Sequence, residues 1–145
     1  MKKIDGGIIM DISAFIKPKN EVIFVFDDQS IHDALETMEK SRYTSIPILS
    51  REGKYVGTLT EGDLLWEIKN SAEFNIKKAE KILVGKMHRL RDYESIHISA
   101  NIDQLITKAS NENFVPVIDD HELFVGIVTR KTLLDYFFEH NFIVL

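Results

Sequence analysis

The stretch "YTSIPILSREGKYVGTLTEGDLL", residues 43–65, returns later in the chain as "NFVPVIDDHELFVGIVTRKTLL", residues 113–134. Each copy holds an apolar residue before proline, a polar turn, an aromatic residue followed by Val-Gly, and a threonine ahead of Leu-Leu. Pro47 and Pro116 are separated by as many positions as the glycines of the two Val-Gly pairs. Because proline is only about 5% of average sequence, so many matches at one offset indicate an internal repeat.

Each repeat contains the pattern of a strand, a helix, a hairpin and a second helix. Apolar residues recur at helical spacing over 31–38 and again over 102–109. A short β-rich run precedes each of these helices, at 22–26 and at 95–99. The two quoted stretches each hold two apolar runs around a short polar turn, which is typical of a hairpin. The sequence therefore predicts an α/β fold built from two β-α-β-β-α units.

The repeats divide the chain into four parts. We expect a flexible leader at 1–11, the first repeat at 12–70, a helical linker at 71–88 and the second repeat at 89–145. A short ordered N-terminal segment is an equal alternative to the leader. Because neither repeat would bury much apolar surface alone, we expect the two to pack together with pseudo-two-fold symmetry.

The composition is that of a globular protein without cysteine chemistry. The chain has 145 residues, of which 44% are hydrophobic and 28% charged, and its net charge is −5 at pH 7. This charge argues against strong non-specific binding of nucleic acid. The absence of cysteine excludes disulfides and favours a cytoplasmic location. No apolar run approaches the ~20 residues that span a bilayer, and no signal peptide is visible, so we expect no membrane association.

The paired motif resembles a known family. In each repeat an apolar-Pro-apolar segment is followed by a Gly-x-x-Thr pattern, and in the first repeat Asp63 completes Gly-x-x-Thr-x-x-Asp. This pattern resembles a pair of CBS domains, also called a Bateman module, over residues 12–138. The arrangement is also similar to stand-alone two-repeat CBS proteins of Gram-positive bacteria, some of which bind cyclic di-AMP. The resemblance implies a regulatory adenine-nucleotide site and a homodimer.

Thr60 and Asp63 have two readings. In the first, they form a capping box at the start of a helix. In the second, they hold a nucleotide: a carboxylate accepts the two hydroxyl donors of a ribose, and a threonine hydroxyl beside helix N–H groups suits phosphate. The resemblance implies nucleotide contact for both residues, and capping is compatible with it.

The base of a nucleotide needs an apolar slot with a few polar backbone edges. Tyr43 can cover a purine, and the backbone at Thr44 and Ser45 can bind its edge; alternatively, Tyr43 is an amphipathic residue at a lobe edge. The resemblance implies that the first strand of the opposite repeat supplies the other wall. These wall residues are Ile96 and His97 for the first site, and Val22 and Phe24 for the second.

The second repeat departs from the motif. Thr129 is in place, but Thr132 stands where the family has Asp, so the anionic ribose acceptor is missing. Arg130 and Lys131 follow Thr129 at the start of the last helix, where cations oppose the helix dipole. We expect them to bind phosphate, with Phe114 on the facing wall; the alternative is a solvated basic pair.

No catalytic or metal set is visible in the sequence. The five histidines are scattered without an i, i+4 pair, and neither a Ser-His-Asp set nor a Gly-rich phosphate loop appears. We therefore expect no enzyme activity, no metal and no cofactor.

The predicted function is sensing of AMP, ADP, ATP or cyclic di-AMP, with signalling to a separate, unidentified effector protein. Trp66 and the aromatic residues Phe137 and Phe138 belong either to the core or to a homodimer face. The alternative function is a non-catalytic dimeric scaffold whose nucleotide clefts are vestigial.

Overall fold

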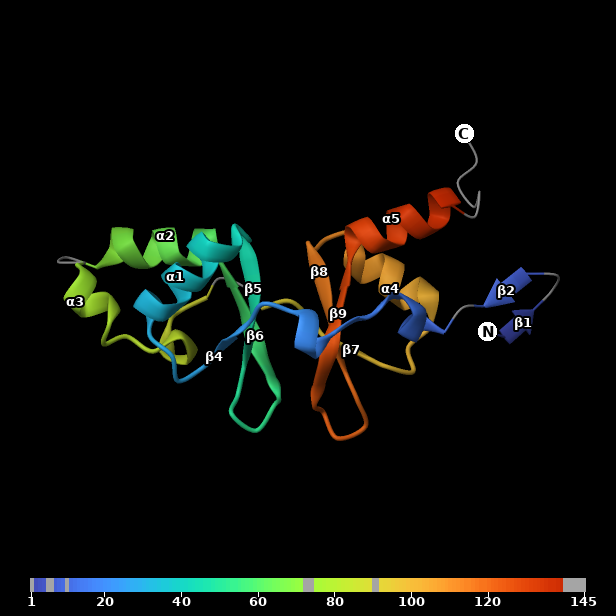
Figure 1. Cartoon of the computed structure of the whole chain (residues 1–145), viewed down its shortest axis with the longest axis horizontal. Helices are drawn as coiled ribbons and strands as arrows, with labels where there is room; N and C mark the ends of the chain where they lie inside the picture. The colour runs from blue at the N-terminus through green and yellow to red at the C-terminus, as the bar shows by residue number, and fades with distance from the viewer. Residues whose placement is uncertain (1, 5–6, 10, 72–74, 90–91, 140–145) are drawn as a thin grey trace. The chain divides into compact units, whose positions relative to one another are not determined.

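The computed structural model of the chain describes residues 2–4, 7–9, 11–71, 75–89 and 92–139. It divides into two compact units (Figure 1). The first-repeat unit is Ile23–Tyr93, and the second-repeat unit combines Met1–Val22 with Glu94–Leu145. Parts of the predicted leader, linker and second repeat lie outside the described residues.

A three-stranded mixed sheet forms the centre of the first-repeat unit. Its strand order is β4-β5-β6, with β4 parallel and β6 antiparallel to β5. A hydrophobic cluster that includes Ile31, Ile46 and Leu59 joins the helices to this sheet. The elements are β4 (Val25–Phe26), α1 (Ile31–Ser41), β5 (Ser45–Leu49), β6 (Tyr55–Thr60), α2 (Glu61–Asn70), α3 (Ile76–Ala79) and the 3-10 helix η3 (Val84–Lys86).

Helix α1 begins at a strong local signal. The Ser30 hydroxyl accepts the N–H of Asp33 at 3.1 Å, and the Asp33 carboxylate accepts the N–H of Ser30 at 3.3 Å. This capping box satisfies two N–H groups that have no partner inside the helix. The buried face carries Ile31, Ala34 and Met38, at the spacing predicted from the sequence.

A four-stranded sheet forms the centre of the second-repeat unit. Its order is β3-β9-β8-β7, with β9 antiparallel to both neighbours and β7 parallel to β8. Its own hydrophobic cluster includes Ile12, Leu105 and Val128. The elements are β1 (Lys2–Ile4), β2 (Gly7–Ile9), η1 (Ile12–Phe15), β3 (Lys17–Pro18), η2 (Lys19–Glu21), β7 (Ile96–His97), α4 (Ile102–Ala109), β8 (Phe114–Ile118), β9 (Phe124–Thr129) and α5 (Arg130–Glu139). Strands β1 and β2 pair as a separate antiparallel ladder.

The predicted α/β fold and the β-α-β-β-α order of each repeat are confirmed, with one correction. The strands predicted at 22–26 and 95–99 are shorter, because only the residues of β4 and β7 pair with β5 and β8. Val22 and Phe24 therefore lie outside the strand. Val22 instead ends the 3-10 helix η2.

Strand β3 precedes the first-repeat unit in the sequence but completes the sheet of the second-repeat unit. It pairs with β9, where Pro18 lies opposite Gly126. Gly126 has a φ of 157°, and a Cβ there would collide with the carbonyl oxygen of Lys17. A glycine at position 126 is therefore required for β3 to pair with β9.

The last helix of each repeat exposes large apolar side chains. The exposed fractions are 62% for Leu65 and 49% for Trp66 on α2, and 47% for Leu134 and 61% for Phe138 on α5. Across the described ranges, no helix combines the length and hydropathy needed to cross a bilayer.

Candidate functional site

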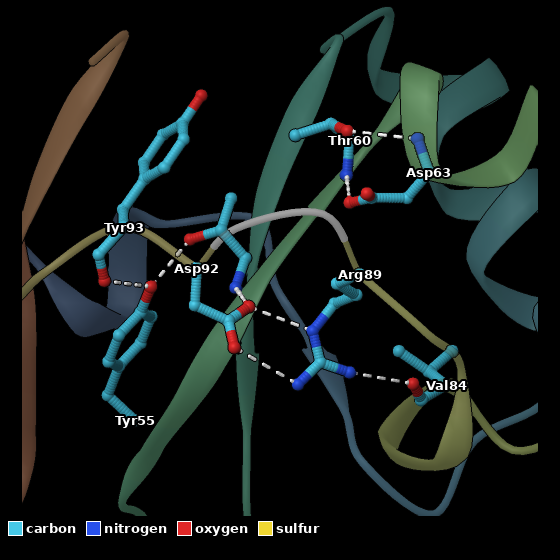
Figure 2. Close-up of polar contacts among 8 residues, drawn as sticks. Tyr55, Thr60, Asp63, Val84, Arg89, Asp92 and Tyr93 are labelled. Atoms are coloured by element: carbon cyan, nitrogen blue, oxygen red, sulfur yellow. Dashed lines mark hydrogen bonds and ion pairs between the residues drawn. The ribbon is translucent and has the colours of Figure 1, made fainter. Parts of the chain in front are cut away.

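The end of β6 and the start of α2 bring Thr60 and Asp63 together (Figure 2). The Thr60 hydroxyl accepts the N–H of Asp63 at 3.1 Å, and the Asp63 carboxylate accepts the N–H of Thr60 at 3.1 Å. The predicted capping box is therefore present. Asp63 is only 5% exposed, so its carboxylate is held in one position at the positive end of the helix dipole.

The segment before Pro47 reaches the same point. Ser45 lies opposite Thr60 in the β5–β6 ladder, and the carbonyl of Thr44 accepts the N–H of Glu61 at 3.0 Å. Tyr43, just before them, is 46% exposed. Of the predicted site residues, the structure thus gathers Thr44, Ser45, Thr60 and Asp63 at one strand-to-helix junction.

The second-repeat unit has the equivalent junction between β9 and α5. Phe114 lies opposite Thr129 in the β8–β9 ladder, as Ser45 does opposite Thr60. The Thr129 hydroxyl accepts the N–H of Thr132 at 3.1 Å, and the two threonine hydroxyls are 2.8 Å apart. The junction keeps the fold of its counterpart but replaces a carboxylate with a hydroxyl.

The two cations of this junction have intramolecular partners. The Arg130 guanidinium donates to the carbonyls of Ala109 at 2.9 Å and Glu112 at 2.8 Å. It therefore fastens the start of α5 to the chain that leaves α4, where carbonyl oxygens carry the negative end of the helix dipole. Lys131 donates to the carboxylate of Asp135 at 2.6 Å, and this bond raises the pKa of Lys131.

A groove of about 720 Å³, lined mostly by residues with polar side chains, lies beside β7 and α4 in the second-repeat unit. Ile96 and His97, predicted as wall residues, both line it. The lining also includes Ser99, Asn101, Asp103 and Lys108. The volume is within the range of small-molecule sites.

His97 is fastened on both sides of its ring. Nδ1 lies 2.7 Å from the Ser99 hydroxyl, and Nε2 lies 2.7 Å from the Asp120 carboxylate. No Ser-His-Asp set was predicted from the sequence, but this linkage places a serine, a histidine and an aspartate together. The backbone N–H of Ser99 also donates to Nδ1 at 3.0 Å, and the Asp120 side chain is 85% exposed. The linkage therefore ties a turn to the β8–β9 hairpin.

The remaining predicted wall residues fall in different units. Val22 is 8% exposed and belongs to the second-repeat unit, whereas Phe24 belongs to the first. The Phe24 ring packs edge-on against Phe26 at 5.3 Å between centroids, and Arg51 stacks over Phe26 at 3.9 Å.

A polar cluster that was not predicted from the sequence lies beside β6, below the Thr60 junction (Figure 2). Asp92 accepts the N–H of Thr58 at 2.9 Å and is paired with Arg89. The one sequence signal for this cluster was the glycine at position 57 inside a strand, where a Cβ would overlap the Asp92 carboxylate. Sequence spacing did not indicate that Asp92 is the residue that approaches Gly57.

A family model for the CBS domain matches residues 11–70 and 81–139. The cyclic di-AMP receptor B of Bacillus subtilis is 26% identical over 129 residues, which are 89% of this chain and 87% of the receptor. The chain spans much less of two other curated relatives. It covers 38% of an uncharacterised Rickettsia prowazekii protein (26% identity) and 19% of the L-aspartate semialdehyde sulfurtransferase of Methanocaldococcus jannaschii (31% identity).

Two solved structures share the fold. CbpB in complex with c-di-AMP superposes with a TM-score of 0.82 at 22% identity, covering 92% of this chain and 89% of CbpB. CBSX2 in complex with AMP has a TM-score of 0.71 at 22% identity, covering 90% of this chain and 98% of CBSX2. At this identity the likeness establishes the fold alone.

Proposed function

Because the chain belongs to the CBS domain family, we propose that it is a regulatory protein that binds an adenine nucleotide and signals to a separate partner protein. The observation that carries the proposal is the convergence of Thr44, Ser45, Thr60 and Asp63 at the β6–α2 junction. The nucleotides named for its fold neighbours, c-di-AMP and AMP, support the ligand class.

Each group at the junction has a role that matches its chemistry. Asp63 accepts the hydroxyl donors of a ribose, and its hydrogen bond to the backbone fixes it for that task. Thr60 and the N–H groups of α2 suit a phosphate. Tyr43 is 46% exposed and can cover the base.

The second-repeat junction suits phosphate more than ribose. Thr129 and Thr132 offer hydroxyls, and Lys131 is an exposed cation that can exchange Asp135 for a ligand. Arg130 would have to leave the carbonyls that end α4, so we assign it the weaker phosphate role. Within the same unit, Phe114 lies opposite Thr129 in the β8–β9 ladder and is the apolar residue that we assign to this junction.

We also propose that two copies associate through α2 and α5. Leu65 and Leu134 occupy equivalent positions in the two repeats, and both are exposed in the single chain. In an isologous contact both copies use the same surface, and the exposed apolar residues of α2 and α5 are the surface that we assign to it. The chemistry of the proposed site is binding alone.

A thermal-shift series with AMP, ADP, ATP and cyclic di-AMP tests the function. A ligand at about 100 times its dissociation constant stabilises the protein by about 2.7 kcal/mol. The Asp63→Ala variant should lose this shift. Asp33→Ala is the matched control, because it removes the same capping bond from α1 in the same unit. A shift that survives Asp63→Ala would reduce Asp63 to a helix cap.

The scaffold function remains the second candidate, and one observation favours it. Arg130 and Lys131 each have a partner within the chain, so neither cation needs an external anion. Absence of a thermal shift with all four nucleotides, together with a dimer in solution, would establish the scaffold instead.

A further inference from the structure

The chain leaves the first-repeat unit beside β6, and a carboxylate holds it there. Asp92 Oδ1 accepts the backbone N–H of Thr58 at 2.9 Å, in the middle of β6. The same carboxylate takes two bonds from Arg89, Nε to Oδ1 at 2.8 Å and Nη2 to Oδ2 at 3.3 Å. Arg89 Nη1 also donates to the carbonyl of Val84 at 3.1 Å (Figure 2).

Gly57 makes room for this carboxylate. A Cβ at Gly57 would overlap the Asp92 carboxylate carbon and both of its oxygens. Its counterpart Gly126 makes room for the backbone of Lys17, which belongs to β3. The same position in the two repeats therefore admits a paired strand in one unit and a single side chain in the other.

A second contact from β6 holds Tyr93, the residue after Asp92. The Tyr55 hydroxyl lies 2.7 Å from the carbonyl oxygen of Tyr93 and 2.7 Å from the Thr58 hydroxyl. Burial raises the pKa of Tyr55, so the phenol keeps its proton as a donor. Tyr93 is the last residue of the first-repeat unit, and Glu94 begins the second segment of the other unit. We call Tyr55, Thr58, Arg89, Asp92 and Tyr93 the exit clamp.

The exit clamp and the candidate site share one strand. Thr58 and Thr60 are alternate residues of β6, so their side chains lie on the same face. Asp92 binds one N–H of this strand and Asp63 binds another. The Asp92 side chain is 38% exposed, whereas that of Arg89 is 11% exposed, so water can replace the carboxylate while the guanidinium stays in place.

From this placement we propose that Asp92 couples the nucleotide site to the path of the chain between the repeats. Ligand bound at Thr60 and Asp63 stabilises the end of β6 and thereby the clamped form, and the clamp pre-forms β6 for ligand. Asp92 is a positioning residue and does not touch the nucleotide. The inference rests on the proposed function, and it names the element through which binding becomes a signal. By linkage the effect is reciprocal.

The test compares Asp92→Asn with Asp28→Asn. Asp28 also pairs with an arginine of this unit, Arg51, at 2.8 Å, but within the described ranges its carboxylate accepts no backbone N–H of a strand. Calorimetry with cyclic di-AMP and AMP measures affinity, and amide hydrogen exchange measures protection of the Thr58 N–H with and without nucleotide. Gly57→Ala is the second variant, because it keeps every clamp side chain and fills the space of the carboxylate.

Coupling predicts that Asp92→Asn and Gly57→Ala each weaken nucleotide binding by at least about fivefold, the lower end of typical coupling. Nucleotide should slow exchange of the Thr58 N–H in the wild type and in Asp28→Asn, and this slowing should be lost in Asp92→Asn. The double variant Gly57→Ala/Asp92→Asn should bind nucleotide with about the affinity of the weaker-binding single variant, because both changes remove the same contact.

Two negative outcomes are distinguishable. If the wild type binds nucleotide and Asp92→Asn binds equally well while its Thr58 N–H exchanges faster, the clamp is only a structural tie and the coupling is wrong. If the folded wild type binds none of the nucleotides, the proposed function fails and the coupling fails with it.

Discussion

Tyr55 shows how much depends on one side chain that sequence patterns do not single out. Its hydroxyl contacts a threonine on its own strand and a carbonyl at the end of the unit. Asp63, by contrast, is recognisable from spacing alone, and the structure gives it the predicted capping bond. A residue that bonds to its neighbours in sequence can be predicted from residue spacing, whereas a residue that bonds to a distant segment cannot.

Replacing Tyr55 with Phe should remove about 1 kcal/mol of unfolding free energy near neutral pH, because a buried carbonyl loses its donor. The folded pKa of Tyr55 is raised, so its contribution is complete below the unfolded value of about 10 and declines as pH rises above it. Urea unfolding at several alkaline pH values should show the two proteins converging.

Tyr43→Phe is the control for this prediction, because Tyr43 is 46% exposed. An ultraviolet titration of the native proteins should show a late-ionising tyrosine that Tyr55→Phe removes and Tyr43→Phe keeps. A wild type whose tyrosines all ionise together would contradict the assignment.

At the scale of elements, each of the two hairpin turns contains a residue with a positive φ, but a different residue type adopts it in each turn. In the β5–β6 turn, Gly53 takes the positive φ of 90°, and the Ser50 hydroxyl accepts the N–H of Lys54. In the β8–β9 turn, Glu122 takes a φ of 62°, which is unfavourable for a residue with a Cβ. The Asp119 carboxylate accepts the N–H groups of His121 and Leu123 there, at 2.8 and 3.0 Å.

The stability of the β8–β9 turn should therefore depend on pH. The backbone donor of Leu123, followed by that of His121, lowers the pKa of Asp119. Stability from this carboxylate is present above its unfolded pKa of about 3.9 and is lost as pH falls through the lower, folded value. Urea unfolding of the wild type and Asp119→Ala should show a difference at neutral pH that shrinks in acid.

Ser50→Ala is the matched control, since it removes the corresponding acceptor from the other turn without removing a charge. Its stability difference from the wild type should not change over the same acid range. An Asp119→Ala difference that stayed constant with pH would show that the carboxylate acts only as a neutral acceptor.

At the scale of the whole molecule, repetition places two exposed apolar helices on one chain. The exposed residues of α2 and α5 include Leu65 and Phe138, with exposed fractions of 62% and 61%. Exposed apolar side chains of this size on equivalent helices are the residues through which we propose that two copies associate. The proposed dimer would cover them.

The double variant Leu65→Glu/Phe138→Glu should convert the dimer to a monomer, because charges would be buried at the contact. Light scattering coupled to size exclusion measures the mass. Ile76→Glu is the control: Ile76 is 68% exposed on α3, outside the proposed surface, and its variant should remain dimeric. A wild type that is monomeric at high concentration would refute the dimer.

Sequence alone determined the doubled α/β architecture and the Thr60–Asp63 capping box, because prolines, glycines, caps and helical spacing act over a few neighbouring residues. It left the ligand role of both residues, and the site that would join Tyr43 to His97, as predictions. Only the tertiary structure decided that β3 completes the second sheet, that Arg130 fastens the end of α4, and that Asp92 holds Thr58. Asp92 and Thr58 are 34 positions apart, and such contacts depend on the path of the chain between them, which no local pattern specifies.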